Sequence, residues 1–218
     1  MTFPAQLSLL LALAGPTRLV TAPADTSTES HRVLPDHHEH PVVQAELDQM
    51  VSGRHTAFYH RALLRQPKWA DLVDTALEDA GLPAWLAAVP LVESGYSNWG
   101  APGAAEPRQS MAPGRIPGRG LWMFIPATAR QYGLRVDDKI DERFDPELET
   151  DAAVALLTDL HDSFGDWGLA LAAYNQGPQA VRSAIQSGGT RDVLELIEQG
   201  ELNPYAAKVM AAAALLER

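Results

Sequence analysis

Apolar residues recur every three or four positions along most of this chain, from about Val42 onward. Leu47 and Met50 form one such pair, and Phe58 and Ala62 form another. This spacing puts apolar side chains on one face of an α-helix, whereas a half-buried strand would alternate apolar and polar residues. No convincing run of alternating β-branched residues interrupts the pattern. The sequence therefore predicts an all-α fold.

The expected helices have recognisable ends. A capping side chain followed by proline marks a start, because a proline in the first turn removes an N–H that has no helical partner there. Glycine marks an end, because it readily adopts the left-handed conformation that closes many helices. The residues that meet these criteria are Pro83, Asp145–Pro146 and Asn203–Pro204 at starts, and Gly177 and Gly200 at ends.

One internal stretch is predicted not to be helical. Residues 98–120, NWGAPGAAEPRQSMAPGRIPGRG, are rich in proline and glycine, which break helices. The stretch carries Arg108, Arg115 and Arg119 against a single acid, Glu106, so it is a basic patch on an acidic chain. We expect a long irregular loop, which is either a mobile insertion or a lid beside a functional site.

Charge and composition exclude several functions. Lys and Arg total 17 and Asp and Glu total 28, which gives a net charge of −11. Phosphate backbones repel such a chain, so we expect no nucleic-acid partner. Without cysteine there is no disulfide, thiolate nucleophile, cysteine-bound zinc or lipid anchor on cysteine. No apolar run approaches the ~20 residues that span a bilayer, so we expect no transmembrane segment.

The first 41 residues are expected to precede the helical domain, which we place at 42–218. The apolar run LSLLLALA and the small residues after it suit a signal peptide over 1–22, although no Lys or Arg precedes the run. An apolar tail or linker is the alternative. Residues 23–41 are polar and typical of a flexible linker. Its histidines, His37, His38 and His40, lack a regular element to fix their geometry, and we predict no metal site.

Glu93 is the candidate catalytic acid. It lies near the end of PAWLAAVPLVES, residues 83–94, which is apolar almost all round and is expected to be a buried helix. At helical spacing Glu93 shares a face with Leu86, Val89 and Pro90. Burial disfavours the charged form of a carboxyl group and raises its pKa, which suits a general acid. The alternative is an exposed Glu93 that contacts solvent or an arginine.

A family resemblance rests on a series of segments. In chain order they are LPAWLAAVPLVESGYSN, GLWMFIPATARQYGL, DERFDP and FGDWGLALAAYNQG. From about Val42 to Leu216 the chain resembles the catalytic domain of the soluble lytic transglycosylases (SLT), and in particular the subgroup of membrane-bound lytic murein transglycosylase D. The resemblance implies a lysozyme-like helical fold. It also implies an enzyme that cleaves the β-1,4 bond between N-acetylmuramic acid (MurNAc) and N-acetylglucosamine (GlcNAc) in peptidoglycan.

The resemblance also implies the site residues. Glu93 matches the family's catalytic glutamate, which acts as general acid and then as base. The residues implied for substrate binding are Ser94, Trp122, Met123, Phe124, Tyr174, Asn175 and Tyr205. Two matches depart from the family pattern. Met123 stands where glutamine is usual, and the arginine that usually precedes the match to Tyr205 is absent.

The implied reaction needs no second carboxylate, metal or cofactor. Protonated Glu93 assists departure of GlcNAc, and the C6 hydroxyl of MurNAc attacks C1 of its own ring to give a 1,6-anhydro product. Two alternatives stay open: a lysozyme- or chitinase-like hydrolase, and a non-catalytic peptidoglycan-binding domain, which the Met123 departure favours. We expect a monomer in the periplasm or cell envelope of a bacterium, or secreted from it.

Overall fold

A computed structural model of the chain describes residues 39–101 and 118–217. The α-helices in these ranges are α1 (Pro41–Val51), α2 (Thr56–Arg65), α3 (Ala70–Asp79), α4 (Ala88–Glu93), α5 (Pro126–Gln131), α6 (Pro146–Phe164), α7 (Trp167–Gln176), α8 (Pro178–Gly188), α9 (Val193–Glu198) and α10 (Tyr205–Leu216). The same ranges contain the short 3₁₀ helices η1 (Gln66–Lys68), η2 (Ala84–Ala87) and η3 (Glu142–Phe144). Over these residues β-pairing is limited to isolated bridges, so the predicted all-α class is confirmed.

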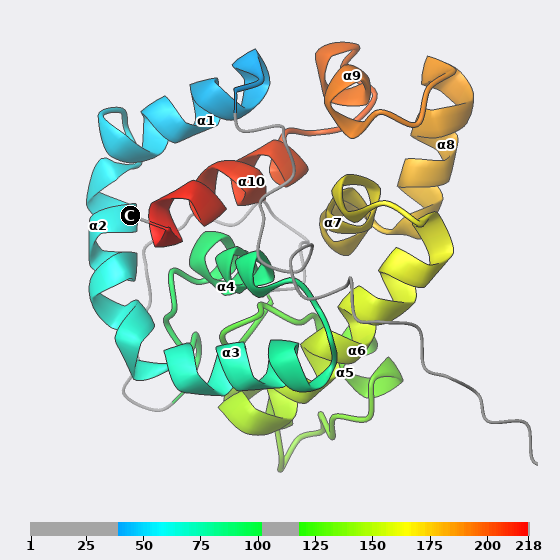
Figure 1. Ribbon diagram of the computed structural model, residues 1–218. Coiled ribbons are helices and arrows are strands. Elements are labelled where there is room, and N and C mark those ends of the chain that lie inside the picture. Colours follow the sequence, from blue (N-terminus) through cyan, green and yellow to red (C-terminus); the bar gives the residue numbers. More distant parts are fainter. Residues whose placement is uncertain (1–38, 102–117, 218) are drawn as a thin grey trace, which may run out of the picture.

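Helix α10 lies at the centre of the core (Figure 1). It packs against α1, α4 and α7, and its buried positions are mostly alanine, whose small side chain lets neighbouring helices approach closely. The buried residues of α10 are Tyr205, Ala206, Ala207, Val209, Met210, Ala211, Ala212 and Ala213. Because α10 packs on α4, its first residue comes close to the end of α4, where Glu93 lies.

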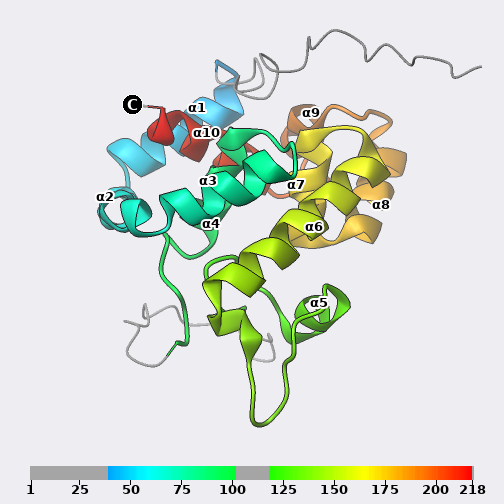
Figure 2. The same ribbon diagram turned by 60° about the horizontal axis from the view of Figure 1, so that its bottom comes forward.

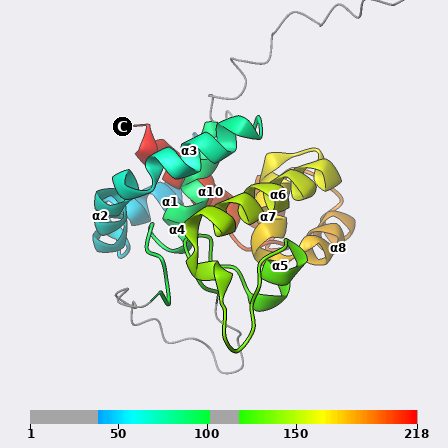
Figure 3. The same ribbon diagram turned by 90° about the horizontal axis from the view of Figure 1, so that it is seen from below.

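Helices α6 and α7 lie side by side, and α3 packs against α6 (Figure 3). The segment between α5 and α6 projects away from the helical body (Figure 2). An isolated bridge joins Val136 to Asp141 within it, and the Asp141 carboxylate lies 2.6 Å from a guanidinium nitrogen of the buried Arg143. The projection leads directly into α6, which supplies buried polar residues to the candidate site.

The predicted boundaries at Asp145–Pro146, Gly177 and Gly200 are confirmed, whereas Pro83 only precedes the 3₁₀ helix η2 and α10 begins one residue after Pro204. Oδ1 of Asp145 accepts hydrogen bonds from the backbone N–H groups of Glu147 and Leu148, at 3.1 and 3.2 Å, and so caps α6. Asn203 accepts one from the N–H of Tyr205 at 3.0 Å. Gly177 and Gly200 follow α7 and α9 with φ of 86° and 77°, values that glycine adopts readily.

The helix expected over residues 83–94 is divided. A 3₁₀ turn, η2, comes first and α4 begins at Ala88. Pro90 explains the break, because proline has no N–H to donate to the carbonyl four residues earlier. With α4 beginning at Ala88, Pro90 falls in the first turn, where that donor is not needed. The expected shared face is present, since Leu86, Val89 and Pro90 are all buried.

The predicted loop over 98–120 is closed at its base. Trp99 and Gly120 exchange two backbone hydrogen bonds, of 3.3 and 2.9 Å, across an isolated antiparallel bridge. Residues 102–117, with Arg108 and Arg115, lie outside the described residues, as do the predicted signal peptide and His37 and His38. His40 caps α1, accepting from the N–H of Val42 at 3.3 Å.

The described ranges contain neither a cluster of metal-binding side chains nor a membrane-spanning helix. Across residues 39–101 and 118–217, no three His, Cys, Asp or Glu side chains cluster where they could hold a metal ion. Over those residues no helix combines the length and apolar character needed to cross a membrane.

Candidate active site

Glu93 is the last residue of α4, and its side chain is half-buried. The apolar residues before it in the helix pack into the core, so its carboxyl group lies at the edge of an apolar wall. The hydroxyl of Tyr205, at the start of α10, donates a 2.6 Å hydrogen bond to Oε1 of Glu93. The carboxyl group therefore has a fixed partner from across the core, which disfavours the alternative of a freely solvated side chain.

Burial raises the pKa of Glu93 from 4.5 to about 7. The hydrogen bond from Tyr205 and the positive charge of Lys208 act in the opposite direction, because both stabilise the carboxylate. Near neutral pH the protonated and ionised forms of Glu93 are thus both populated. Such a group can donate a proton in one step and accept one in the next.

Two tyrosines stand beside Glu93 as a stacked pair. The rings of Tyr174, on α7, and Tyr205 are 6.4 Å apart between centroids and inclined by 10°. The hydroxyl of Tyr174 donates to the backbone carbonyl oxygen of Trp122 at 2.7 Å. Burial raises the pKa of both tyrosines well above 10, so both remain protonated hydrogen-bond donors.

The turn at residues 120–124 is built around a buried acid. Both carboxyl oxygens of Glu149, on α6, accept backbone N–H bonds, from Leu121 at 2.6 Å and from Trp122 at 3.1 Å. The indole of Trp122 donates to the hydroxyl of Thr150 at 3.0 Å. Within the turn Met123 has a φ of 58°, which is unusual for a residue other than glycine.

Comparison with known proteins identifies the family. Residues 74–197, more than half of the chain, match the family described as the Transglycosylase SLT domain. This chain belongs to the SLT domain family. The resemblance of the four segments is thereby confirmed.

Named relatives agree with the family match. This chain is 29% identical over 169 residues to membrane-bound lytic murein transglycosylase D of Escherichia coli (strain K12), a match that covers 75% of this chain and 35% of that protein. The protein of the same name from a second Escherichia coli strain gives the same figures. The chain thus spans about a third of the length of these curated relatives.

A solved structure shares the fold of the SLT domain. It is an inactive mutant of lytic transglycosylase Slt from Pseudomonas aeruginosa, with a TM-score of 0.50 and 21% identity, covering 78% of this chain and 25% of that chain. This likeness confirms the expected lysozyme-like helical fold.

The predicted substrate-binding residues differ in how much of their surface is exposed. Ser94, Trp122 and Phe124 are buried, with 1%, 0% and 3% of their surface exposed, so their side chains belong to the core beneath the site. Met123 is half-buried, and Asn175 is exposed. Asn175 accepts a 3.0 Å hydrogen bond from the side chain of Asn203, which links the end of α7 to the start of α10.

Sequence reasoning missed Glu149 and Thr150. Both have 0% of their surface exposed, although they occupy the N-terminal part of a helix where polar residues usually contact water. Their partners, in the turn at residues 120–124, come almost thirty positions earlier in the chain. No local sequence pattern predicts the contacts of Glu149 and Thr150 with this turn, because polar residues are also common at the solvent-exposed starts of helices.

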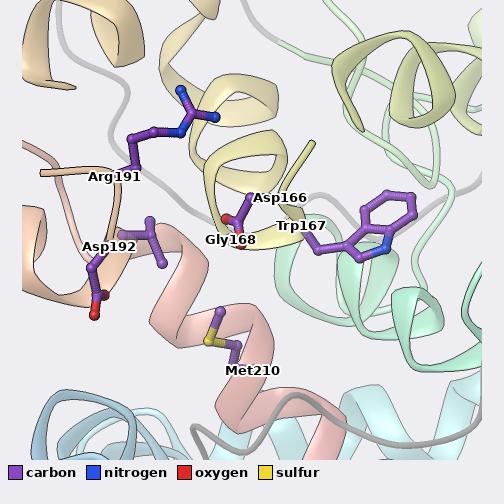
Figure 4. A pocket seen from close by; sticks show the side chains of 7 residues that line it. Asp166, Trp167, Gly168, Arg191, Asp192 and Met210 are labelled. Atoms are coloured by element: carbon purple, nitrogen blue, oxygen red, sulfur yellow. The ribbon is translucent and has the colours of Figure 1, made fainter. Parts of the chain in front are cut away.

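A cavity of about 360 Å³ lies away from Glu93, at the N-terminal end of α7 (Figure 4). Asp166, Arg191 and Met210 are among the residues that line it. Asp166 precedes Tyr174 by eight positions, more than two turns of helix or roughly 12 Å along its axis. The cavity is therefore distinct from the surroundings of Glu93.

Proposed function

We propose that this chain is a lytic transglycosylase that cleaves the MurNAc-β-1,4-GlcNAc bond of peptidoglycan and leaves 1,6-anhydroMurNAc. The observation that carries the proposal is the half-buried carboxyl group of Glu93, with a pKa of about 7 and a hydrogen bond from Tyr205. Membership of the SLT family supports the reaction class. The relatives' name, lytic murein transglycosylase, supports peptidoglycan as the substrate.

Glu93 performs both proton transfers in the proposed mechanism. As the acid, it donates its proton to the glycosidic oxygen while the bond between that oxygen and C1 of MurNAc breaks, and GlcNAc leaves as an alcohol. Positive charge then develops on the MurNAc ring, and the new carboxylate of Glu93 stabilises it. As the base, Glu93 removes the proton from the C6 hydroxyl while that oxygen bonds to C1. The carboxyl group is then protonated again.

The neighbouring residues assist in two ways. Tyr205 donates to the carboxylate of Glu93, which stabilises the ionised form produced by the first proton transfer. Met123 and Asn175 reach the surface and contact the glycan, whereas the buried Ser94, Trp122 and Phe124 hold the wall of the site. The proposed division follows from exposure, since a buried side chain has no surface to offer a sugar.

A hydrolase would need a second carboxylate to activate water or to act as nucleophile. Three acids near the start of α6 are already engaged in other contacts. Asp141 pairs with Arg143, Asp145 caps α6, and Glu149 is buried under the turn at residues 120–124. Each is held by structural bonds, which favours the internal C6 hydroxyl over water as the nucleophile.

Product analysis tests the proposal. Purified peptidoglycan is digested with the protein, and the chain ends are identified by mass spectrometry. We expect non-reducible 1,6-anhydro ends, absent with Glu93→Gln and retained with the matched control Glu195→Gln, which removes an exposed acid on α9. Reducing ends, or full activity of Glu93→Gln, would contradict the proposal. Retained binding to insoluble peptidoglycan without any product would support a non-catalytic binding domain.

The proposed substrate also gives the proposed location. Peptidoglycan lies in the bacterial envelope, so we infer that the protein acts in the periplasm or at the cell wall. We expect it to act as a monomer, which sedimentation of the purified protein would test.

A further inference from the structure

Glu149 is a buried acid that the proposed proton transfers do not use. It lies in the first turns of α6 with 0% of its surface exposed. Its carboxyl group accepts backbone hydrogen bonds from Leu121 and Trp122, and burial raises its pKa well above the ordinary value although the positive charge of Arg143 acts in the opposite direction. Burying a carboxyl group is costly unless its oxygens are hydrogen-bonded. Here the turn at residues 120–124 supplies those bonds.

The same turn depends on Glu149. Gly120 has a φ of 83°, and a Cβ added there would lie 2.2 Å from both carboxyl oxygens of Glu149. Met123 also has a left-handed backbone, with a φ of 58°. In a residue other than glycine, such as Met123, this conformation persists only where the surroundings hold it. The two backbone hydrogen bonds to the buried carboxyl group of Glu149 are a contact of this kind.

The turn at residues 120–124 is connected to Glu93 through two tyrosines. The N–H of Trp122 donates to Glu149 at 3.1 Å, and the carbonyl oxygen of Trp122 accepts from the hydroxyl of Tyr174 at 2.7 Å. Tyr174 stacks on Tyr205, with ring centroids 6.4 Å apart. Tyr205 then donates to Glu93 at 2.6 Å. A continuous series of contacts thus joins α6 to the end of α4.

We infer that Glu149 is a positioning residue of the active site. Its carboxyl group fixes the turn at residues 120–124, the Trp122 carbonyl fixes the Tyr174–Tyr205 pair, and the pair fixes the carboxyl group of Glu93. The catalytic consequence rests on the proposed function. The effect on Glu93 itself is measurable without turnover.

The test is a titration of the Glu93 carboxyl group by ¹³C NMR, with its signal assigned by its absence in Glu93→Gln. In Glu149→Gln an amide NH₂ replaces one acceptor oxygen, so the turn loosens and the hydrogen bond from Tyr205 weakens. Because that bond lowers the pKa of Glu93, we expect the pKa to rise above its value in the unaltered protein. We expect turnover of peptidoglycan to fall at least about tenfold.

Thr150→Val is the matched control. It removes the neighbouring buried hydrogen bond to the Trp122 indole and leaves the carboxyl group of Glu149 in place. We expect it to lower the thermal midpoint without moving the titration of Glu93. An equal shift in Thr150→Val and Glu149→Gln would reduce Glu149 to a general stability role and overturn the inference.

Two further results decide the remaining cases. A folded Glu149→Gln with an unmoved Glu93 titration overturns the inference. If Glu149→Gln does not fold, Tyr174→Phe breaks the next contact in the series: an upward shift of the Glu93 pKa supports the inference, and no shift overturns it. Absence of peptidoglycan cleavage by the unaltered protein would refute the proposed function alone, since the titrations are independent of it.

Discussion

At the scale of single residues, ionisation of the Glu93 carboxyl group makes the free energy of unfolding depend on pH. Its pKa is about 7 in the folded protein against an ordinary 4.5, so between these values the folded state binds more protons than the unfolded state. The free energy of unfolding therefore falls as pH rises from about 4.5 to about 7.

Glu93→Gln should remove this fall in the free energy of unfolding with rising pH, because an amide does not ionise but still accepts the hydrogen bond from Tyr205. We expect the variant to be more stable than the unaltered protein at pH 8, by about 1–3 kcal/mol, and nearly equal at pH 5. Urea unfolding at both pH values measures the difference, with Glu195→Gln as the control for loss of a surface acid. A difference that is the same at both pH values would refute a raised pKa at Glu93.

By the family resemblance, Met123 stands at the position where a glutamine is expected. Its thioether is a weak acceptor with no donor, whereas a glutamine amide supplies both. We expect Met123→Gln to bind peptidoglycan fragments roughly threefold to tenfold more tightly, the equivalent of about one added hydrogen bond. Calorimetry in the Glu93→Gln background measures binding without cleavage, and Met123→Leu is the matched control. Weaker or unchanged binding would indicate that other residues have replaced this contact.

At the scale of elements, the turn at residues 120–124 is the least tolerant segment near the site. In Gly120→Ala the new Cβ would meet the Arg143 carbonyl and both Glu149 oxygens at 2.2 Å, in a backbone already at a φ of 83°. We expect a loss of at least about 3 kcal/mol in the free energy of unfolding. Chemical denaturation of the purified variant measures it.

Gly133→Ala is the control for backbone conformation alone. Gly133 has a φ of 87°, and a Cβ there meets no atom within 4 Å. We expect a loss of about 1–2 kcal/mol, the ordinary cost of a left-handed residue with a side chain. Equal losses in the two variants would show that contact with Glu149 adds nothing to the cost at Gly120.

At the scale of the whole molecule, the cavity at the start of α7 and the surroundings of Glu93 are separate regions. Arg191 lines the cavity, and its guanidinium donates to the carbonyl oxygen of Phe164 at the end of α6. We expect Arg191→Ala to lower stability by about 1 kcal/mol and to leave peptidoglycan turnover within about twofold of the unaltered protein. A tenfold loss of turnover in a fully folded Arg191→Ala would instead place the cavity on the path of the glycan.

Much of the secondary structure was predictable, because its signals are local. The cap at Asp145 and the glycine ends at Gly177 and Gly200 involve atoms within a few residues of one another. The break before Ala88 was not predicted, although its cause, Pro90, is in the sequence. The apolar pattern of residues 83–94 suits a single helix, and the missing N–H of Pro90 decides where the helix can begin.

Helical spacing and capping act over one or two turns, so the sequence alone predicts the all-α class, several helix ends and Glu93 as the candidate acid on an apolar helix. The residues that surround this acid depend on the tertiary packing. Tyr205 meets Glu93 from 112 positions away, and Glu149 meets Trp122 from 27 positions away. Packing of α10 on α4 brings the first pair together. Burial of apolar faces is non-directional, so no local pattern in the sequence indicates which residues will meet.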